Sequence, residues 1–200
     1  FDIAQTPDGN YLFAIGDVTG KGVPAALLMA NLQAMLHVLL PIDITLAEAT
    51  NQINDIIYEN TPPDKFITFF WGKFYRDDSS FKYVNAGHNP PVWLLKDTDE
   101  PKELEEGGLI LGAMPSNTSY REETITLSSG DLLVFYTDGV TEARSHDGEE
   151  EYGEGRLLEC IKQHREATAG ELQDAIISDV QSFSPELQYD DITLIVLKVN

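Results

Sequence analysis

Two consecutive helical segments, residues 24–40 and 45–60, most constrain the fold, because strand-like runs lie on both sides of them. Pro24 suits the first turn of a helix. Thr45 and Glu48 have the spacing of a capping box, which predicts the start of the second helix. Strands before this pair need partners from later in the chain, so the sequence predicts an α+β fold with helices packed on sheet faces.

The remaining apolar runs are rich in aromatic and β-branched residues, which is typical of strands. They lie at residues 1–5, 11–15, 66–75, 81–86, 92–95, 120–127, 132–136 and 192–199. Helical periodicity recurs in two later segments, 155–165 and 169–183. Thr168 and Glu171 repeat the capping-box spacing before the second of these. We predict that the polar segment 96–108 is a mobile loop and that residues 1–200 form a single domain.

Acidic residues outnumber basic ones, with 34 Asp and Glu against 13 Lys and Arg, and the net charge is −21. Such a chain is repelled by nucleic-acid phosphates and by anionic membrane surfaces, so we exclude generic nucleic-acid binding. Most of the carboxylates, including those of segments 97–106 and 147–154, are interpreted as ordinary solvation.

Cysteine content and the apolar stretches bound the class of protein further. Cys160 is the single cysteine, which excludes a disulfide framework and a cysteine-based zinc site, and a reducing, cytoplasmic compartment fits. The apolar stretch 25–40 is interrupted by polar residues and predicts a core helix, so we expect no direct insertion into a membrane. The first residue is Phe1, and we expect an N-terminally truncated fragment of a longer protein.

Three segments place aspartates at the ends of predicted strands. Asp17 and Asp138 each follow a strand, and Asp190 with Asp191 precedes one. If these strands are neighbours, the carboxylates converge on one edge of the core, which is costly unless a cation or shared protons compensate. Hard oxygen ligands favour Mg²⁺ or Mn²⁺. Each segment alone also fits ordinary turn or capping chemistry, so the metal hypothesis depends on all three together.

Two other segments raise alternatives. Residues 16–22 lie between a strand and a helix, as a phosphate-binding P-loop does, but the glycine spacing and the residue after Lys21 do not fit that motif. His88 lies in the segment 85–91 (NAGHNPP), whose histidine and two asparagines exceed what a bend requires. A histidine that bonds neighbouring backbone is the favoured interpretation.

Four ordered motifs resemble one family. They are residues 17–26 (DVTGKGVPAA), 85–91 (NAGHNPP), 136–143 (YTDGVTEA) and 190–193 (DDIT). In this order they are similar to the bacterial type 2C-like serine/threonine phosphatases of the stage II sporulation protein E and sigma-B regulator class. The resemblance covers nearly the whole chain. It implies a four-layer α-β-β-α sandwich with two central antiparallel sheets.

The resemblance also implies a binuclear Mn²⁺ or Mg²⁺ centre. Carried over by motif, Asp17 would bridge the two metals, and the Val18 carbonyl would bind one of them. Asp138 and Asp190 would bind through their side chains, and Asp191 would orient them. A metal-bound water would then attack phosphorus directly, without a phosphoenzyme. Further candidates for supporting or substrate contacts are Lys21, His88, Asn89 and Gly139.

The substrates implied are phosphoserine or phosphothreonine residues of a small partner protein, of the anti-sigma-factor antagonist type, in partner-switching signalling. An upstream sensor or coiled-coil region of the same chain would press on the helices at 24–40 and 45–60. The oligomeric state stays open, with a homodimer among the candidates.

The sequence departs from the family pattern in three ways. Phe1 and Asp2 match the end of a Gly-Gly-Asp-x-x-Asp motif, whose earlier Asp ligand would precede the chain. Thr19 stands where animal relatives have a histidine, so no general acid can be carried over. The phosphate-binding arginine of those relatives would lie in the N-terminal part that precedes Phe1, and Lys21 is a candidate substitute for it. The alternative function is therefore a catalytically weak or inactive regulatory module of the same fold. A hydrolase of small phosphoesters or nucleotides is a third hypothesis.

Overall fold

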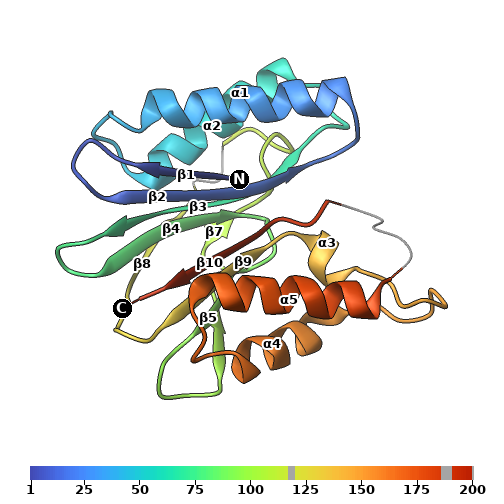
Figure 1. The fold of residues 1–200 in the computed structure, drawn as a ribbon. Helices are drawn as coiled ribbons and strands as arrows, with labels where there is room; N and C mark the ends of the chain where they lie inside the picture. The colour runs from blue at the N-terminus through green and yellow to red at the C-terminus, as the bar shows by residue number, and fades with distance from the viewer. Residues whose placement is uncertain (117–119, 186–190, 200) are drawn as a thin grey trace. The chain divides into compact units, whose positions relative to one another are not determined.

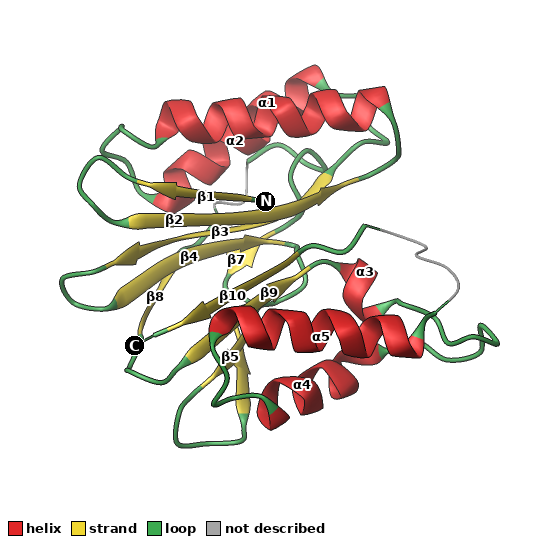
Figure 2. Cartoon of the chain, viewed as in Figure 1, coloured by secondary structure: helices red, strands yellow, loops and turns green. Residues whose placement is uncertain are grey.

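The computed structural model describes residues 1–116, 120–185 and 191–199 (Figure 1). The chain divides into two compact units, of which the first comprises Phe1–His88 with Glu105–Leu127 and the second Asn89–Leu104 with Ser128–Asn200. Each unit has its own sheet and its own helices (Figure 2). The expectation of a single domain stays a prediction.

The sheet of the first unit has the strand order β1-β2-β3-β4-β7, and β8 also pairs with β4. Its strands are β1 (Asp2–Gln5), β2 (Tyr11–Val18), β3 (Ile67–Tyr75), β4 (Ser80–Ala86), β7 (Gly107–Gly108) and β8 (Glu123–Thr126). All pairs are antiparallel except β4–β7, which is parallel.

Helices α1 (Val23–Leu39) and α2 (Leu46–Asn60) lie on one face of this sheet (Figure 1). Pro24 occupies the first turn of α1, and Thr45 with Glu48 forms the predicted capping box of α2. Apolar side chains of the helices and the sheet form one core, which includes Leu32, Leu36, Ile53, Ile57, Ile67, Phe69 and Trp71. In the part of the chain that is described, no helix has both the length and the apolar character needed to cross a bilayer.

The sheet of the second unit has the order β10-β9-β5-β6, and every pair in it is antiparallel. Its strands are β5 (Val92–Leu94), β6 (Pro101–Glu103), β9 (Leu132–Tyr136) and β10 (Leu194–Lys198). Helices α4 (Gly153–Gln163) and α5 (Ala169–Phe183) pack on it, and Thr168 with Glu171 forms the predicted capping box of α5. Their shared core includes Val134, Tyr136, Leu157, Ile161, Leu172 and Ile176.

Segment 96–108 is not the loop that its polar composition predicts. Strand β6 forms within it and pairs with β5, and strand β7 forms at its end and pairs with β4. Both are edge strands of two or three residues, so backbone pairing rather than apolar side chains places them. A short helix after β9, α3 (Asp138–Thr141), was also not predicted.

Candidate active site

Asp17 and Val18 lie at the end of β2, on a strand that is longer than its apolar run predicts. Asp17 is in register with Thr68 of β3, and Val18 is in register with Ile67. Gly16 permits this pairing, because a Cβ at that position would lie 2.8 Å from the Thr68 carbonyl oxygen. The Asp17 side chain is exposed, whereas Val18 is buried.

Thr19 fixes the loop between this strand end and α1. Its backbone N–H donates to the Phe66 carbonyl at 3.1 Å, and its hydroxyl accepts from the Phe66 N–H at 3.0 Å. Gly20 and Gly22 follow with φ values of 96° and 76°, which glycine adopts at little cost. Lys21, between them, is exposed. The hydrogen bonds of Thr19 therefore hold the backbone just after Asp17 in place, and the exposed Lys21 follows in the same loop.

His88 lies at the end of β4, near the same strand ends of the first unit. Its Nδ1 is 3.0 Å from the Thr68 hydroxyl, and Thr68 is the register partner of Asp17. The Asn85 side chain accepts from the His88 N–H at 2.8 Å and donates to the His88 carbonyl at 3.1 Å. The two hydrogen bonds between the Asn85 side chain and the His88 backbone account for one asparagine of the NAGHNPP segment. The His88 ring itself bonds to the Thr68 hydroxyl. Asn89 belongs to the second unit.

In the second unit, the Asp138 turn packs directly on the segment that contains Asp191. The Thr137 hydroxyl donates to the Asp191 carbonyl at 3.2 Å and accepts from the Thr193 N–H at 3.0 Å. A Cβ on Gly139 would lie only 2.5 Å from the Asp191 carbonyl oxygen. The structure thus brings two of the predicted acidic motifs together, and it does so through a glycine whose missing side chain allows the approach. Asp190 lies outside the described residues.

The predicted convergence of the aspartate carboxylates on one sheet edge stays a prediction. Strands β9 and β10 are direct neighbours, but β2 belongs to the other sheet. Neighbouring strands therefore explain the placement of Asp138 with Asp191 and not that of Asp17. Within residues 1–116, 120–185 and 191–199, no group of three or more His, Cys, Asp or Glu side chains is arranged to hold a metal ion.

Two residues near the Asp17 loop were missed as candidates. Thr68 is one, although it lies in the segment 66–68 (FIT), which also resembles a segment of the family. Lys65 is the other, since its Nζ lies 3.1 Å from the position that a Cβ on Gly20 would take. No sequence pattern marks this lysine, because the contact arises from the pairing of the segments before β3 and after β2.

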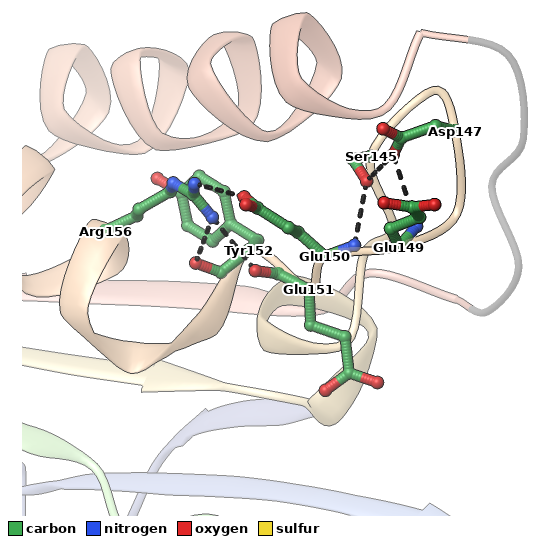
Figure 3. A network of polar contacts seen from close by, with 7 residues as sticks. All are labelled: Ser145, Asp147, Glu149, Glu150, Glu151, Tyr152 and Arg156. Carbon is green, nitrogen blue, oxygen red and sulfur yellow. Dashed lines mark hydrogen bonds and ion pairs between the residues drawn. The ribbon is translucent and has the colours of Figure 1, made fainter.

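Other reactive groups of the second unit have structural roles. Burial raises the pKa of the Cys160 thiol to about 11, so at neutral pH it stays protonated and does not supply a thiolate nucleophile. The acidic segment before α4 forms an internal network (Figure 3). Ser145 donates to Asp147 at 2.6 Å, and Arg156 pairs with Glu150 at 2.9 Å. Several of these carboxylates thus take part in the turn and in ion pairs, and the solvating role of the others stays a prediction.

Comparisons with known proteins agree with the motif order. The family model described as "Stage II sporulation protein E (SpoIIE)" matches residues 7–200. Phosphoserine phosphatase RsbU of Bacillus subtilis (strain 168) is 32% identical over 185 residues, which cover 92% of this chain and 54% of that protein. The chain therefore spans about half the length of this relative.

Solved structures of similar fold extend over the whole chain. A structure of the PP2C phosphatase domain and a regulatory-domain fragment of SpoIIE from Bacillus subtilis has a TM-score of 0.81 at 21% identity, covering 99% of this chain and 57% of that one. RsbX in complex with magnesium has a TM-score of 0.68 at 17% identity, covering 97% and 83%. These likenesses confirm the predicted α+β fold class, that of the type 2C phosphatases.

Proposed function

The chain belongs to the stage II sporulation protein E (SpoIIE) family, and from that premise we propose that it hydrolyses phosphoserine or phosphothreonine in a partner protein with the help of divalent metal ions. The observation that carries the proposal is the packing of the Thr137–Gly139 turn on the backbone of Asp191. In this packing the backbones of two acidic motifs are in contact, and carboxylates held close to one another are costly unless cations or protons compensate them.

The donor set fits Mn²⁺ or Mg²⁺. Asp17, the Val18 carbonyl, Asp138 and Asp190 would hold the ions, with Asp191 beside them, and carboxylate and carbonyl oxygens are what such hard cations prefer. When bound, the metals supply a water of lowered pKa and positive charge for the phosphoryl oxygens. The magnesium complex of RsbX, a protein of the same fold, supports this choice of ion.

The protein's own groups would align and attract the substrate. Thr19 bonds to Phe66 on both sides and so holds the loop after Asp17 in one conformation. Lys21 and Lys65, both at this loop, offer positive charge to a phosphate in a protein whose net charge is otherwise −21. At physiological salt, the repulsion between a phosphate and carboxylates more than about 8 Å away is largely screened. Nearby cations such as these lysines therefore dominate the electrostatic attraction of the substrate.

The partner protein is proposed from the relatives. RsbU is named a phosphoserine phosphatase, and the chain matches it over 92% of its own length. We therefore propose a phosphorylated, anti-sigma-factor antagonist-like protein as the substrate, acted on in the cytoplasm under control of a sensor region upstream in the same protein.

The test is turnover of p-nitrophenyl phosphate and of a phosphoserine peptide by the intact protein, with and without Mn²⁺. Asp138→Asn should lower the Mn²⁺-dependent rate by about a hundredfold or more, because each 1.36 kcal/mol of lost charge stabilisation costs about tenfold. Asp97→Asn makes the same charge change at an exposed position of the same unit and should leave the rate unchanged.

Calorimetry with Mn²⁺ separates this proposal from its alternative. If the folded protein does not bind Mn²⁺ and does not turn over the phosphoester, the result would favour the alternative, a non-catalytic regulatory module. Full activity in Asp138→Asn would refute the assignment of the metal ligands.

A further inference from the structure

The side chain of Asn54, on α2, is buried and bonds to three residues of segment 112–116. Its Nδ2 donates to the Met114 carbonyl and to Ser116 Oγ, both at 2.9 Å. Its Oδ1 accepts from the Gly112 N–H at 2.9 Å. The Tyr120 hydroxyl lies 3.2 Å from the same oxygen, but its one proton has a nearer acceptor in the Leu109 carbonyl at 2.8 Å. Both donor hydrogens of the amide and one acceptor position of its oxygen are therefore used on segment 112–116. The Asn54 side chain is thus hydrogen-bonded to both ends of segment 112–116.

Neighbouring residues of α2 strengthen this grip. Asp55 accepts from the Ser116 N–H at 2.8 Å, and the Asn51 carbonyl accepts from the Ser116 hydroxyl at 3.1 Å. Gly112 has a φ of 84°, and a Cβ there would lie 2.7 Å from Cγ2 of Ile57. The segment is therefore pressed against the helix as well as bonded to it.

The other side of the segment borders the end of β2. Leu111, next to Gly112, exchanges two backbone hydrogen bonds with Ile67, at 2.9 and 3.0 Å. Ile67 is the register partner of Val18, and the next residue of β3 is the partner of Asp17. A continuous set of bonds therefore leads from Asn54 through Leu111 and Ile67 to the strand end that carries two predicted metal ligands.

We propose that Asn54 is a positioning residue for the Asp17 end of β2. By holding segment 112–116 on α2, it keeps Leu111 paired with Ile67 and so fixes the backbone from which Asp17 and the Val18 carbonyl project. The catalytic part of this inference rests on the proposed function, whereas the mechanical link stands on the contacts of the first unit alone.

Asn54→Asp tests the link with little change in shape. The aspartate keeps an acceptor for Gly112 but loses both donors and presents a carboxylate to the Met114 carbonyl. We expect kcat for p-nitrophenyl phosphate to fall about tenfold with KM unchanged, because a misplacement of about 1 Å remote from the chemistry can cost up to ~100-fold.

Thr50→Val is the matched control. Thr50 is also a buried polar residue of α2, but its hydroxyl bonds to the Leu46 carbonyl at 2.7 Å and to Trp71 Nε1 at 2.9 Å, and neither bond involves segment 112–116. This variant should keep wild-type kcat even if it lowers stability. Ser116→Ala is a milder second variant, should Asn54→Asp fail to fold. We expect it to lower kcat two- to threefold, since the hydroxyl that accepts from Asn54 and donates to the Asn51 carbonyl is lost while the other bonds of Asn54 remain.

Hydrogen exchange gives a readout that does not need catalysis. In Asn54→Asp and Ser116→Ala, amides of segments 109–116 and 15–22 should exchange faster, whereas Thr50→Val should leave segment 15–22 as in the wild type. Faster exchange confined to 109–116, or equal effects of Thr50→Val, would overturn the link. A wild type without turnover but with this exchange pattern would refute the proposed function and keep the positioning role.

Discussion

Replacing Gly139 by alanine tests the contact that joins the Asp138 turn to Asp191. The new Cβ would lie 2.5 Å from the Asp191 carbonyl oxygen and 3.1 Å from its carbonyl carbon. Ordinary Cβ contacts begin at 3.4 Å, so one of the two backbones must move by about 0.9 Å. Neither is a flexible side-chain end, so the displacement cannot be absorbed by a rotamer change.

The expected cost follows from two opposing effects. Alanine favours helix α3 over glycine by up to about 1 kcal/mol, whereas overpacking costs about 1–3 kcal/mol. We therefore expect Gly139→Ala to lower the free energy of unfolding by about 1–2 kcal/mol. The same displacement separates Asp138 from Asp191, and kcat should fall at least about tenfold.

Urea denaturation and turnover of p-nitrophenyl phosphate measure the two effects. Gly155→Ala is the control, because nothing lies within 4 Å of a Cβ at that helical position. It should raise stability by about 0.5–1 kcal/mol and leave kcat unchanged. Wild-type stability and kcat in Gly139→Ala would show that the Asp138 turn does not depend on this close approach.

Two further predictions concern the second unit. Thr168→Ala removes the hydroxyl that accepts from the Glu171 N–H and should lower the free energy of unfolding by about 1 kcal/mol; an unchanged urea midpoint would contradict the capping assignment. Burial raises the pKa of Cys160 from 9.0 to about 11, so alkylation of the native protein at pH 8, followed by mass spectrometry, should be far slower than that of the unfolded protein. Because the folded state holds this proton more tightly, the thiol's contribution to stability is full below pH 9 and is lost as pH rises toward 11; equal alkylation rates in the two states would refute the burial argument.

Local chemistry explains what the sequence predicts well. The capping boxes at Thr45 and Thr168 involve residues three positions apart, and both form as expected. Helices and strands with a clear apolar periodicity are likewise found, because the apolar side chains that make up the periodic pattern are the ones that pack into the core.

Pairing between distant segments explains what was missed. Strand β2 continues through Gly16 and Asp17 because β3 pairs along it, although both residues favour turns. Strands β6 and β7 have no apolar sequence pattern, and they form because their backbones pair with β5 and β4. For the same reason the sequence could name Asp138 and Asp191 as candidates but not the glycine contact between them, and it gave no sign of Lys65.

The pairing of β9 with β10 has a consequence for the order in which the molecule can form. The Asp138 turn leaves the ribosome well before its companion strand, because helices α4 and α5 lie between them in the chain. At about 5–20 residues a second, that interval is several seconds, and such a long-range pairing is also slow to close. Throughout this time the acidic turn has no backbone partner at Thr193. During synthesis, helices α4 and α5 are therefore available before the pairing that joins the two acidic motifs.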